Sequence, residues 1–207
     1  GIKLPGGWVE NGSIRVSGIL PQYQPGSPLQ KFSANPWQLG TTVNGTLLPP
    51  DLDVTGRMQV RVPAGEPNLP DTLEIPFDLR LTSRRVSLKT ASYVSAKGSW
   101  DFRGFYDLQE EAGRLFVDLE SIPLQTLSDY FSSTNCKGIL SGQLTADFPS
   151  PNLKDLDLNG RWTLTDFAAA AFAAEKVRGQ IHMRSGRAEL RNIIAQQGPG
   201  VIRGDGT

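Results

Sequence analysis

The sequence predicts an all-β protein: an extended, curved antiparallel sheet that forms an open, taco-like β-groove, with one or two short helices. A frame of alternating apolar residues with glycine at its centre recurs along the chain, as in residues 52–60. The 22 glycines and 15 prolines among 207 residues suit many short strands joined by turns. Because side chains alternate between the two faces of a strand, each frame has one apolar face and one polar face.

The glycine frame returns in the same phase throughout the chain. It is found again at residues 14–20, 98–102, 140–144, 156–164 and 177–183. Repetition of one strand unit predicts an array of strands rather than a single catalytic pocket. We expect one repetitive segment over residues 1–207, loosely divided into sub-blocks 1–93 and 94–207. We also expect a longer parent chain, because a further frame begins at Val201.

Turn signals separate the expected strands. Residues 11–12 and 44–45 are both Asn-Gly, the strongest short hairpin signal, because both residue types accept positive φ. Residues 21–37 and 63–70 are rich in proline, which lacks the backbone donor that a sheet requires, and they predict irregular loops. Residues 109–113, Gln-Glu-Glu-Ala-Gly, predict a turn between two neighbouring antiparallel strands.

Two segments favour short helices. Residues 122–131 place apolar side chains three and four positions apart, and Pro123 suits a first helical turn. Residues 166–176 are rich in alanine, the best helix former, and Asp166 is a candidate N-cap.

Composition excludes several classes of function. Lys plus Arg equals Asp plus Glu at 21 each, without a basic patch, so we expect no nucleic-acid partner. Cys136 is the single cysteine and predicts neither an internal disulfide nor a metal site, and no cofactor is expected. His182 is the single histidine and falls on a polar strand face, and no nucleophile elbow or phosphate loop is present. We therefore expect no catalytic residues and no enzyme.

The C-terminal half of the chain resembles a known family. The residues that carry the likeness are the stretch 150–164 (Ser-Pro-Asn-Leu-Lys-Asp-Leu-Asp-Leu-Asn-Gly-Arg-Trp-Thr-Leu), residues 177–181 (Val-Arg-Gly-Gln-Ile), residues 186–193 and residues 200–206. This pattern is similar to the AsmA-like superfamily, closest to repeats of the translocation and assembly module (TamB) type. Residues 197–204 also fit the related subunit N of type II secretion, which is a second family option. The likeness covers residues 94–207 and, loosely, residues 12–62.

The resemblance implies a fold and a function. It implies an open β-groove, polar outside and apolar inside, within a protein that bridges two membranes and serves phospholipid transport and outer-membrane biogenesis. The implied location is the periplasm or an intermembrane space, with the parent chain anchored in the inner membrane outside this segment. The implied partners are phospholipid acyl chains and outer-membrane assembly proteins.

Apolar residues that share the phase of the frames are the candidate lipid-groove residues. They are Leu52, Val54, Met58, Val60, Trp100, Phe102, Leu144, Leu158, Trp162, Leu164, Ile181 and Met183. A glycine in the middle of each row favours an unfilled trough, but it equally fits a bulge in a filled sandwich. Ordinary core packing therefore remains an alternative for each of these residues.

Two other functions are compatible with the same strands. One is a β-scaffold or interaction module that engages partner strands in protein translocation or secretion through open sheet edges. The other is a glycan-binding or hydrolytic β-sandwich, suggested by Trp37, Trp100 and Trp162.

Overall fold

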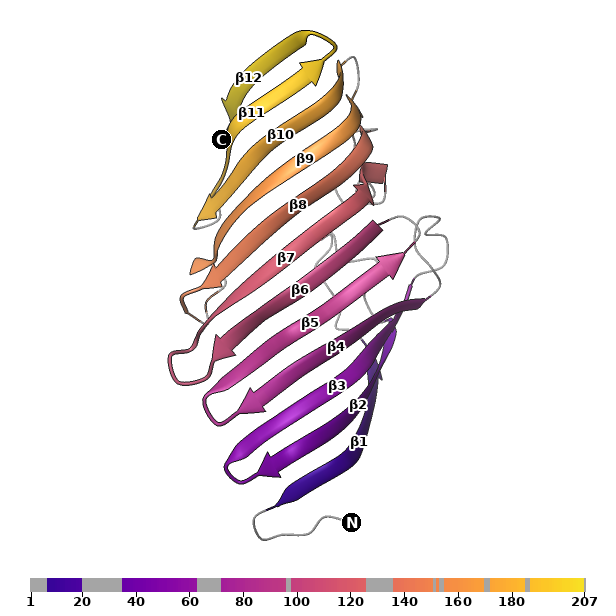
Figure 1. Ribbon diagram of the computed structural model, residues 1–207, viewed down its shortest axis with the longest axis vertical. Coiled ribbons are helices and arrows are strands. Elements are labelled where there is room, and N and C mark those ends of the chain that lie inside the picture. The colour runs from indigo at the N-terminus through magenta and orange to yellow at the C-terminus, as the bar shows by residue number, and fades with distance from the viewer. Residues whose placement is uncertain are drawn as a thin grey trace. The chain divides into compact units, whose positions relative to one another are not determined.

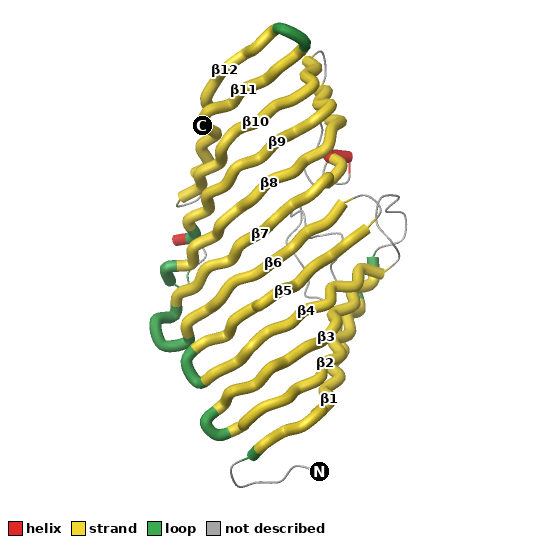
Figure 2. The backbone as a smooth tube through the Cα atoms, viewed as in Figure 1, coloured by secondary structure: helices red, strands yellow, loops and turns green. Residues whose placement is uncertain are grey.

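The computed structural model describes residues 7–19, 35–62, 72–95, 98–125, 136–150, 152, 155–169, 172–184 and 187–206. Over these ranges the protein is all-β. Twelve strands form one open antiparallel sheet in which every strand pairs with its neighbours in sequence (Figures 1 and 2). The all-β class and the open antiparallel sheet predicted from the sequence are thus confirmed.

The strands are long and follow one another along the chain. They are β1 (Trp8–Ile19), β2 (Pro36–Leu47), β3 (Pro50–Arg61), β4 (Thr72–Thr82), β5 (Arg85–Ser95), β6 (Gly98–Asp107), β7 (Ala112–Pro123), β8 (Cys136–Phe148), β9 (Asp157–Ala169), β10 (Phe172–Arg184), β11 (Arg187–Gln197) and β12 (Gly200–Gly206). The chain divides into two compact units. The N-terminal unit comprises residues 1–93 with 103–109, and the C-terminal unit comprises residues 94–102 with 110–207.

Regular pairing dominates the centre of the N-terminal unit. Strands β2, β3 and β4 pair without a register shift, so that Leu39 lies opposite Met58, and Met58 lies opposite Ile75. Directly opposed residues in an antiparallel sheet point to the same face. The apolar positions of these three strands therefore form continuous rows across one face of the unit.

The two Asn-Gly pairs do not form hairpins, and that prediction was wrong. Asn11 has φ +51° and lies inside β1, where the register with β2 shifts between Val9 and Gly12. Gly45 lies inside β2, opposite Leu52, and the turn that follows β2 is at residues 48–49. The two segments are joined instead, because the backbone N–H of Asn11 donates to Oδ1 of Asn44 at 2.7 Å.

A buried carboxylate fastens the turn between β4 and β5. Asp107, at the end of β6, is 2% exposed and accepts from Nε of Arg84 at 3.0 Å, while a guanidinium nitrogen of Arg85 lies 3.6 Å away. The backbone N–H of Leu108 donates to the carbonyl of Arg84 at 2.7 Å. The guanidinium of Arg85 also lies 4.5 Å from the centre of the Phe105 ring. A buried carboxylate requires such partners because desolvation of an unpaired charge is costly.

Register shifts are frequent in the C-terminal unit. They occur between β7 and β8, β8 and β9, β10 and β11, and β11 and β12. Several residues near these shifts have positive φ, including Ser121 (+55°) and Asn192 (+53°). Each shift marks a β-bulge or a similar irregularity of the pairing, and a bulge adds local twist and changes the direction of a strand.

The alanine-rich helix predicted for residues 166–176 is absent, and that prediction was wrong. Residues 166–169 end β9 and residues 172–176 begin β10, with Phe167 opposite Ala174. Asp166 has φ +52°, which an N-cap residue does not adopt. Pairing with the flanking strands therefore overrides the helix propensity of alanine.

The other predicted helix falls largely outside the described residues. Ile122 and Pro123 belong to the end of β7, residues 124–125 form a helical turn, and residues 126–131 are not described. Ile122, which was expected on the helix, is a buried strand residue with 3% exposure.

The C-terminal unit contains a small apolar cluster. Ala174, Val177 and Ala195 are buried on β10 and β11. Partly buried neighbours pack against them, namely Trp162, Leu164, Phe167 and Ile193. Ala174 lies within the segment for which the helix was expected, so this part of the segment contributes to a strand-based cluster instead.

Candidate functional site

The apolar face of the N-terminal unit brings together the candidate groove residues of β3. Leu52, Val54, Met58 and Val60 occupy alternate positions of this strand and share one face. Val54 lies between Val43 of β2 and Leu79 of β4, and the other three residues have apolar or glycine neighbours on both sides as well. The candidates of β3 therefore belong to a wider apolar surface.

The apolar face of the C-terminal unit contains a second group of candidates on β8, β9 and β10. Leu158 lies opposite Met183, while Leu164 lies between Leu140 and Val177. Three further candidates, Leu144, Trp162 and Ile181, lie opposite a glycine in a neighbouring strand. Trp100 and Phe102 lie at alternate positions of β6 and are half-buried.

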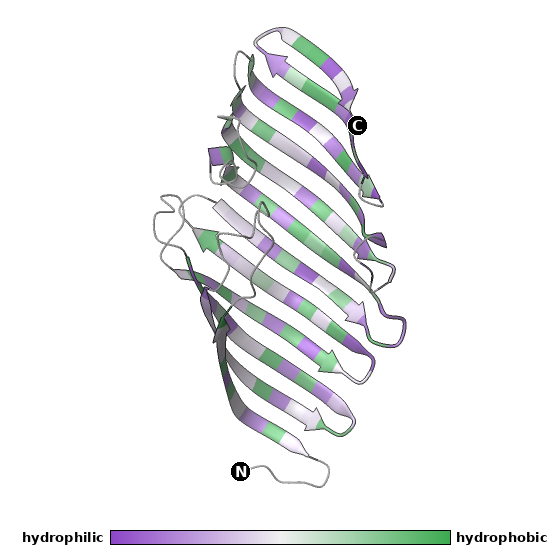
Figure 3. Ribbon diagram, turned by 180° about the vertical axis from the view of Figure 1, so that it is seen from behind, coloured by the Kyte–Doolittle hydropathy of each residue, from purple (hydrophilic) through white to green (hydrophobic). Residues whose placement is uncertain are grey.

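All but one of the candidate groove side chains remain partly exposed. Val60 is buried at 7% exposure, and every other candidate is half-buried. Among the described residues no element lies outside the sheet to cover its apolar face. Figure 3 shows apolar and polar segments alternating along the strands, as expected for a sheet with one apolar and one polar face.

Large side chains lie over the central glycines of the apolar face. A methyl group at Gly179 would lie 2.7 Å from Cζ2 of Trp162, and one at Gly56 would lie 2.7 Å from Cζ of Phe77. Such distances are shorter than van der Waals contact, so the rings rest directly on the glycine backbone. Leu144 covers Gly160 in the same way, where the methyl group would lie 2.3 Å from Cδ2. At these positions side chains from adjacent strands occupy the space above the glycines, which therefore leave no unfilled trough there, and Gly179 also lies at the register shift between β10 and β11.

The packing of rings on glycines has a consequence for the shape of the surface. An aromatic side chain that packs on a strand glycine projects less from the sheet than one whose cross-strand neighbour carries a side chain. Aromatic packing on strand glycines is also a recognised means of stabilising sheets. Glycine and aromatic residue together form a low apolar floor, and this pairing occurs in both units, at Gly56 and at Gly179.

The polar face of the N-terminal unit carries ion pairs between strands. Arg80 donates two hydrogen bonds to the carboxylate of Asp51, each at 2.9 Å, and Nζ of Lys89 donates to Asp53 at 2.7 Å. The hydrogen bond from Arg80 lowers the pKa of Asp51, and the hydrogen bond to Asp53 raises the pKa of Lys89. All four side chains are exposed by about half, so these pairs keep the polar face charged in water.

The polar face of the C-terminal unit holds the single histidine, as the sequence predicts. Nδ1 of His182 lies 2.6 Å from Oδ1 of Asn159, whose amide nitrogen donates to Asp157 at 2.9 Å. Arg114 pairs with Asp147 on the same face, and this hydrogen bond raises the pKa of Arg114. Among the described residues, His182 thus contacts Asn159 and Asp157, two polar side chains on the same face of the sheet.

The described residues contain no candidate metal site. Within the described ranges, no three His, Cys, Asp or Glu side chains lie close enough together to hold a metal ion. Cys136 is a half-buried free thiol at the start of β8. Across the same ranges, no helix has the length and apolar character needed to cross a membrane.

The candidate list from the sequence omitted several residues of the apolar face. Ile75, Phe77 and Leu79 of β4 lie directly opposite Met58, Gly56 and Val54. The strict alternation of residues 73–81 was visible in the sequence and is the signal by which these residues could have been included. That Phe77 lies over Gly56 depends on strand register, which the sequence alone does not reveal.

Comparisons with known proteins identify no relative. No family model matches the chain, and neither the curated proteins nor the solved structures contain a match.

Proposed function

We propose that the apolar faces of this protein bind acyl chains, as a segment of a bridge-like protein that transports phospholipid between membranes and supports outer-membrane biogenesis. The observation that carries this proposal is the half-exposed apolar face of each unit, on which no second layer lies in the described ranges. Soluble proteins seldom leave wide apolar surfaces uncovered unless these surfaces bind something. The resemblance to the AsmA-like superfamily points in the same direction.

The free energy of acyl-chain transfer fits transport of lipid better than its storage. Moving an acyl chain of about sixteen carbons from water to an apolar surface gains roughly 0.8 kcal/mol per methylene, or on the order of 13 kcal/mol in total. The same transfer from a bilayer is nearly neutral, since both environments are apolar. A partly exposed apolar face therefore lowers the barrier of the aqueous gap without trapping the lipid.

The low floor formed by rings on glycines suits an extended, featureless ligand. Trp162 on Gly179 and Phe77 on Gly56 present flat apolar surfaces that need no directional contact with a methylene chain. Lipid passage requires no reactive group, so the proposal assigns no catalytic residue and no cofactor. In this proposal the protein acts in the periplasm or an intermembrane space, within a parent chain anchored in the inner membrane.

Site-specific photo-crosslinking tests the proposal with a control on the opposite face of the same strand. Met183 and His182 are neighbours on β10 that point to opposite faces, and Met58 and Asp53 likewise lie on opposite faces of β3. A benzophenone amino acid at position 183 or 58 should form adducts with phospholipid, detected by mass spectrometry of the protein purified from cells. The same probe at position 182 or 53 should form few.

The crosslinking outcomes separate the candidate functions. Lipid adducts confined to positions 183 and 58 support acyl-chain binding. Adducts with polypeptide alone at these positions contradict lipid transport and favour the interaction module that engages partner strands. Equal lipid labelling at all four positions indicates adsorption to lipid without use of the apolar face, and it also contradicts the proposal.

A further inference from the structure

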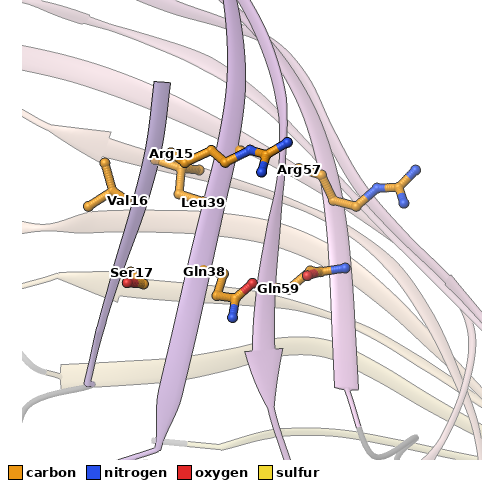
Figure 4. Close-up of a pocket in the computed structure, with 8 residues that line it drawn as sticks. Arg15, Val16, Ser17, Gln38, Leu39, Arg57 and Gln59 are labelled. Atoms are coloured by element: carbon orange, nitrogen blue, oxygen red, sulfur yellow. The ribbon is translucent and has the colours of Figure 1, made fainter. Parts of the chain in front are cut away.

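A notch on the polar face of the N-terminal unit places two arginines on either side of a glycine. Arg15 of β1 lies opposite Gly40 of β2, and Gly40 lies opposite Arg57 of β3. With strands about 4.8 Å apart, the two arginines start from positions about 9.6 Å apart. Figure 4 shows both guanidinium groups extending in the same direction. Both side chains line one depression, so a ligand held there can contact both arginines.

Polar side chains form a second row beside the arginines. Ser17 lies opposite Gln38, which in turn lies opposite Gln59 (Figure 4). Both rows line a depression of about 580 Å³, which we call the arginine notch. Its lining includes Arg15, Gly40 and Arg57 of the first row and Ser17, Gln38 and Gln59 of the second. Nothing lies within 4 Å of the position that a side chain at Gly40 would begin to fill. The glycine thus leaves room for a ligand between the two cations.

The charge of the notch is only partly balanced. Nη1 of Arg57 lies 3.1 Å from one carboxylate oxygen of Glu74. The other carboxylate oxygen of Glu74 accepts a hydrogen bond from Nε2 of Gln59 at 2.7 Å. A guanidinium has five N–H donors, so Arg57 retains donors for a further acceptor. Arg15 has no hydrogen-bond or ion-pair partner among the described residues. Two positive groups therefore face one carboxylate, which leaves one excess positive charge.

We propose that the arginine notch binds a phosphate group. Two guanidinium groups supply donors that match the geometry of phosphate oxygens, and such charge-assisted hydrogen bonds are the strongest of their kind. Donors are available in both rows, and a phosphate presents acceptor oxygens on more sides than a planar carboxylate, so it can use more of them. The phosphate belongs either to a lipid headgroup or to a free phosphate compound. The notch lies on the face opposite the apolar rows, so this inference is independent of acyl-chain binding.

Titration with inorganic phosphate at constant ionic strength tests the inference. The backbone amide of Gly40 reports binding through its NMR chemical shift. The wild-type chain should show a saturable shift, and Arg15→Gln and Arg57→Gln should each weaken binding about tenfold, as expected for the loss of a charged hydrogen bond. Arg178→Gln is the matched control, because it removes the same charge from an exposed position on the polar face of β10.

A second variant fills the notch without changing its charge. Gly40→Leu should abolish binding while leaving the fold intact, because the position is open and leucine suits a strand. Vesicles of phosphatidylglycerol distinguish the two sources of phosphate. Sedimentation with these vesicles that is lost in Arg57→Gln assigns a lipid headgroup. Binding of phosphate without such sedimentation assigns a free phosphate compound.

Three results would overturn the inference. The first is the absence of a saturable shift in the wild-type chain, and the second is unchanged affinity in Gly40→Leu. The third is an equal loss of affinity in Arg178→Gln and Arg57→Gln, which would indicate a general effect of charge rather than a site.

Discussion

The two units of this protein stabilise the same repeated strand pattern in different ways. In the N-terminal unit, β2, β3 and β4 keep an uninterrupted register, and ion pairs such as Arg80 with Asp51 connect strands across the polar face. In the C-terminal unit the register shifts in four pairs of strands, and an apolar cluster around Val177 packs beside these shifts. The N-terminal unit also has register shifts, between β1 and β2 and between β4 and β5, so the contrast is between the regular centre of that unit and the C-terminal unit.

The difference teaches which interactions matter in each unit. Exposed ion pairs typically contribute from nothing to about 1 kcal/mol each, whereas a buried aliphatic side chain contributes about 1.5 to 3 kcal/mol. The N-terminal unit therefore depends on regular pairing and on its buried valines, Val43, Val60 and Val62, more than on its charges. The C-terminal unit depends on its apolar cluster. Three variants test this contrast, in order of decreasing expected effect.

Gly45→Ala should give the largest effect and should act on the N-terminal unit. Gly45 has φ +132°, and a methyl group there would lie 2.1 Å from the carbonyl oxygen of Asp51. Backbone strain and the clash together should lower the free energy of unfolding by about 3 kcal/mol or more. Urea denaturation followed by circular dichroism measures the change.

A matched glycine in the C-terminal unit provides the control. Nothing lies within 4 Å of a methyl group at Gly204 in β12, so Gly204→Ala should change stability by less than about 0.5 kcal/mol. Similar losses of stability in Gly45→Ala and Gly204→Ala would contradict a special requirement for glycine at position 45 of the N-terminal unit.

Val177→Ala should destabilise the C-terminal unit by an intermediate amount. Val177 is 6% exposed and belongs to the cluster with Ala174 and Ala195, so its truncation removes buried methyl groups and leaves a cavity. We expect a loss of about 2 kcal/mol in the free energy of unfolding, measured by the same urea titration. Ile202→Ala, at a side chain that is 62% exposed, should have almost no effect. An equal loss in both variants would contradict the role assigned to the cluster.

Asp51→Asn should give the smallest effect, and only above acidic pH. Because the hydrogen bond from Arg80 lowers the pKa of Asp51 in the folded state, ionised Asp51 stabilises the fold above its unfolded pKa of about 3.9. This contribution is lost as the pH falls through the lower folded pKa. Thermal unfolding should therefore separate wild type and variant slightly at pH 7 and bring them together near pH 2. A separation that grows on acidification would contradict this assignment.

Local pattern accounts for most of what could be predicted. The alternation of apolar and polar residues in segments such as 52–60 and 73–81 identified strands and their faces, because side-chain direction in a strand depends only on a period of two. Errors occurred where local preference and strand pairing disagreed. The Asn-Gly pair at residues 44–45 became part of β2, and residues 166–169 and 172–176 became parts of β9 and β10.

The candidate site was likewise predictable from local pattern only in part. Its residues were recognisable from their phase, but the position of Trp162 over Gly179 joins two strands whose register is not encoded in either strand alone. The arginine notch was not recognised at all. Arg15, Gly40 and Arg57 are far apart in the sequence, and only pairing places them in one row.

By itself, the sequence of this protein determined that strands form, which faces of them are apolar, and that charge is balanced across the chain. The tertiary structure decided which residues lie opposite one another, where bulges interrupt the pairing, and which side chains cover the glycines. The physical reason is that strand direction and face follow from neighbouring residues, whereas register minimises the free energy of contacts between distant parts of the chain.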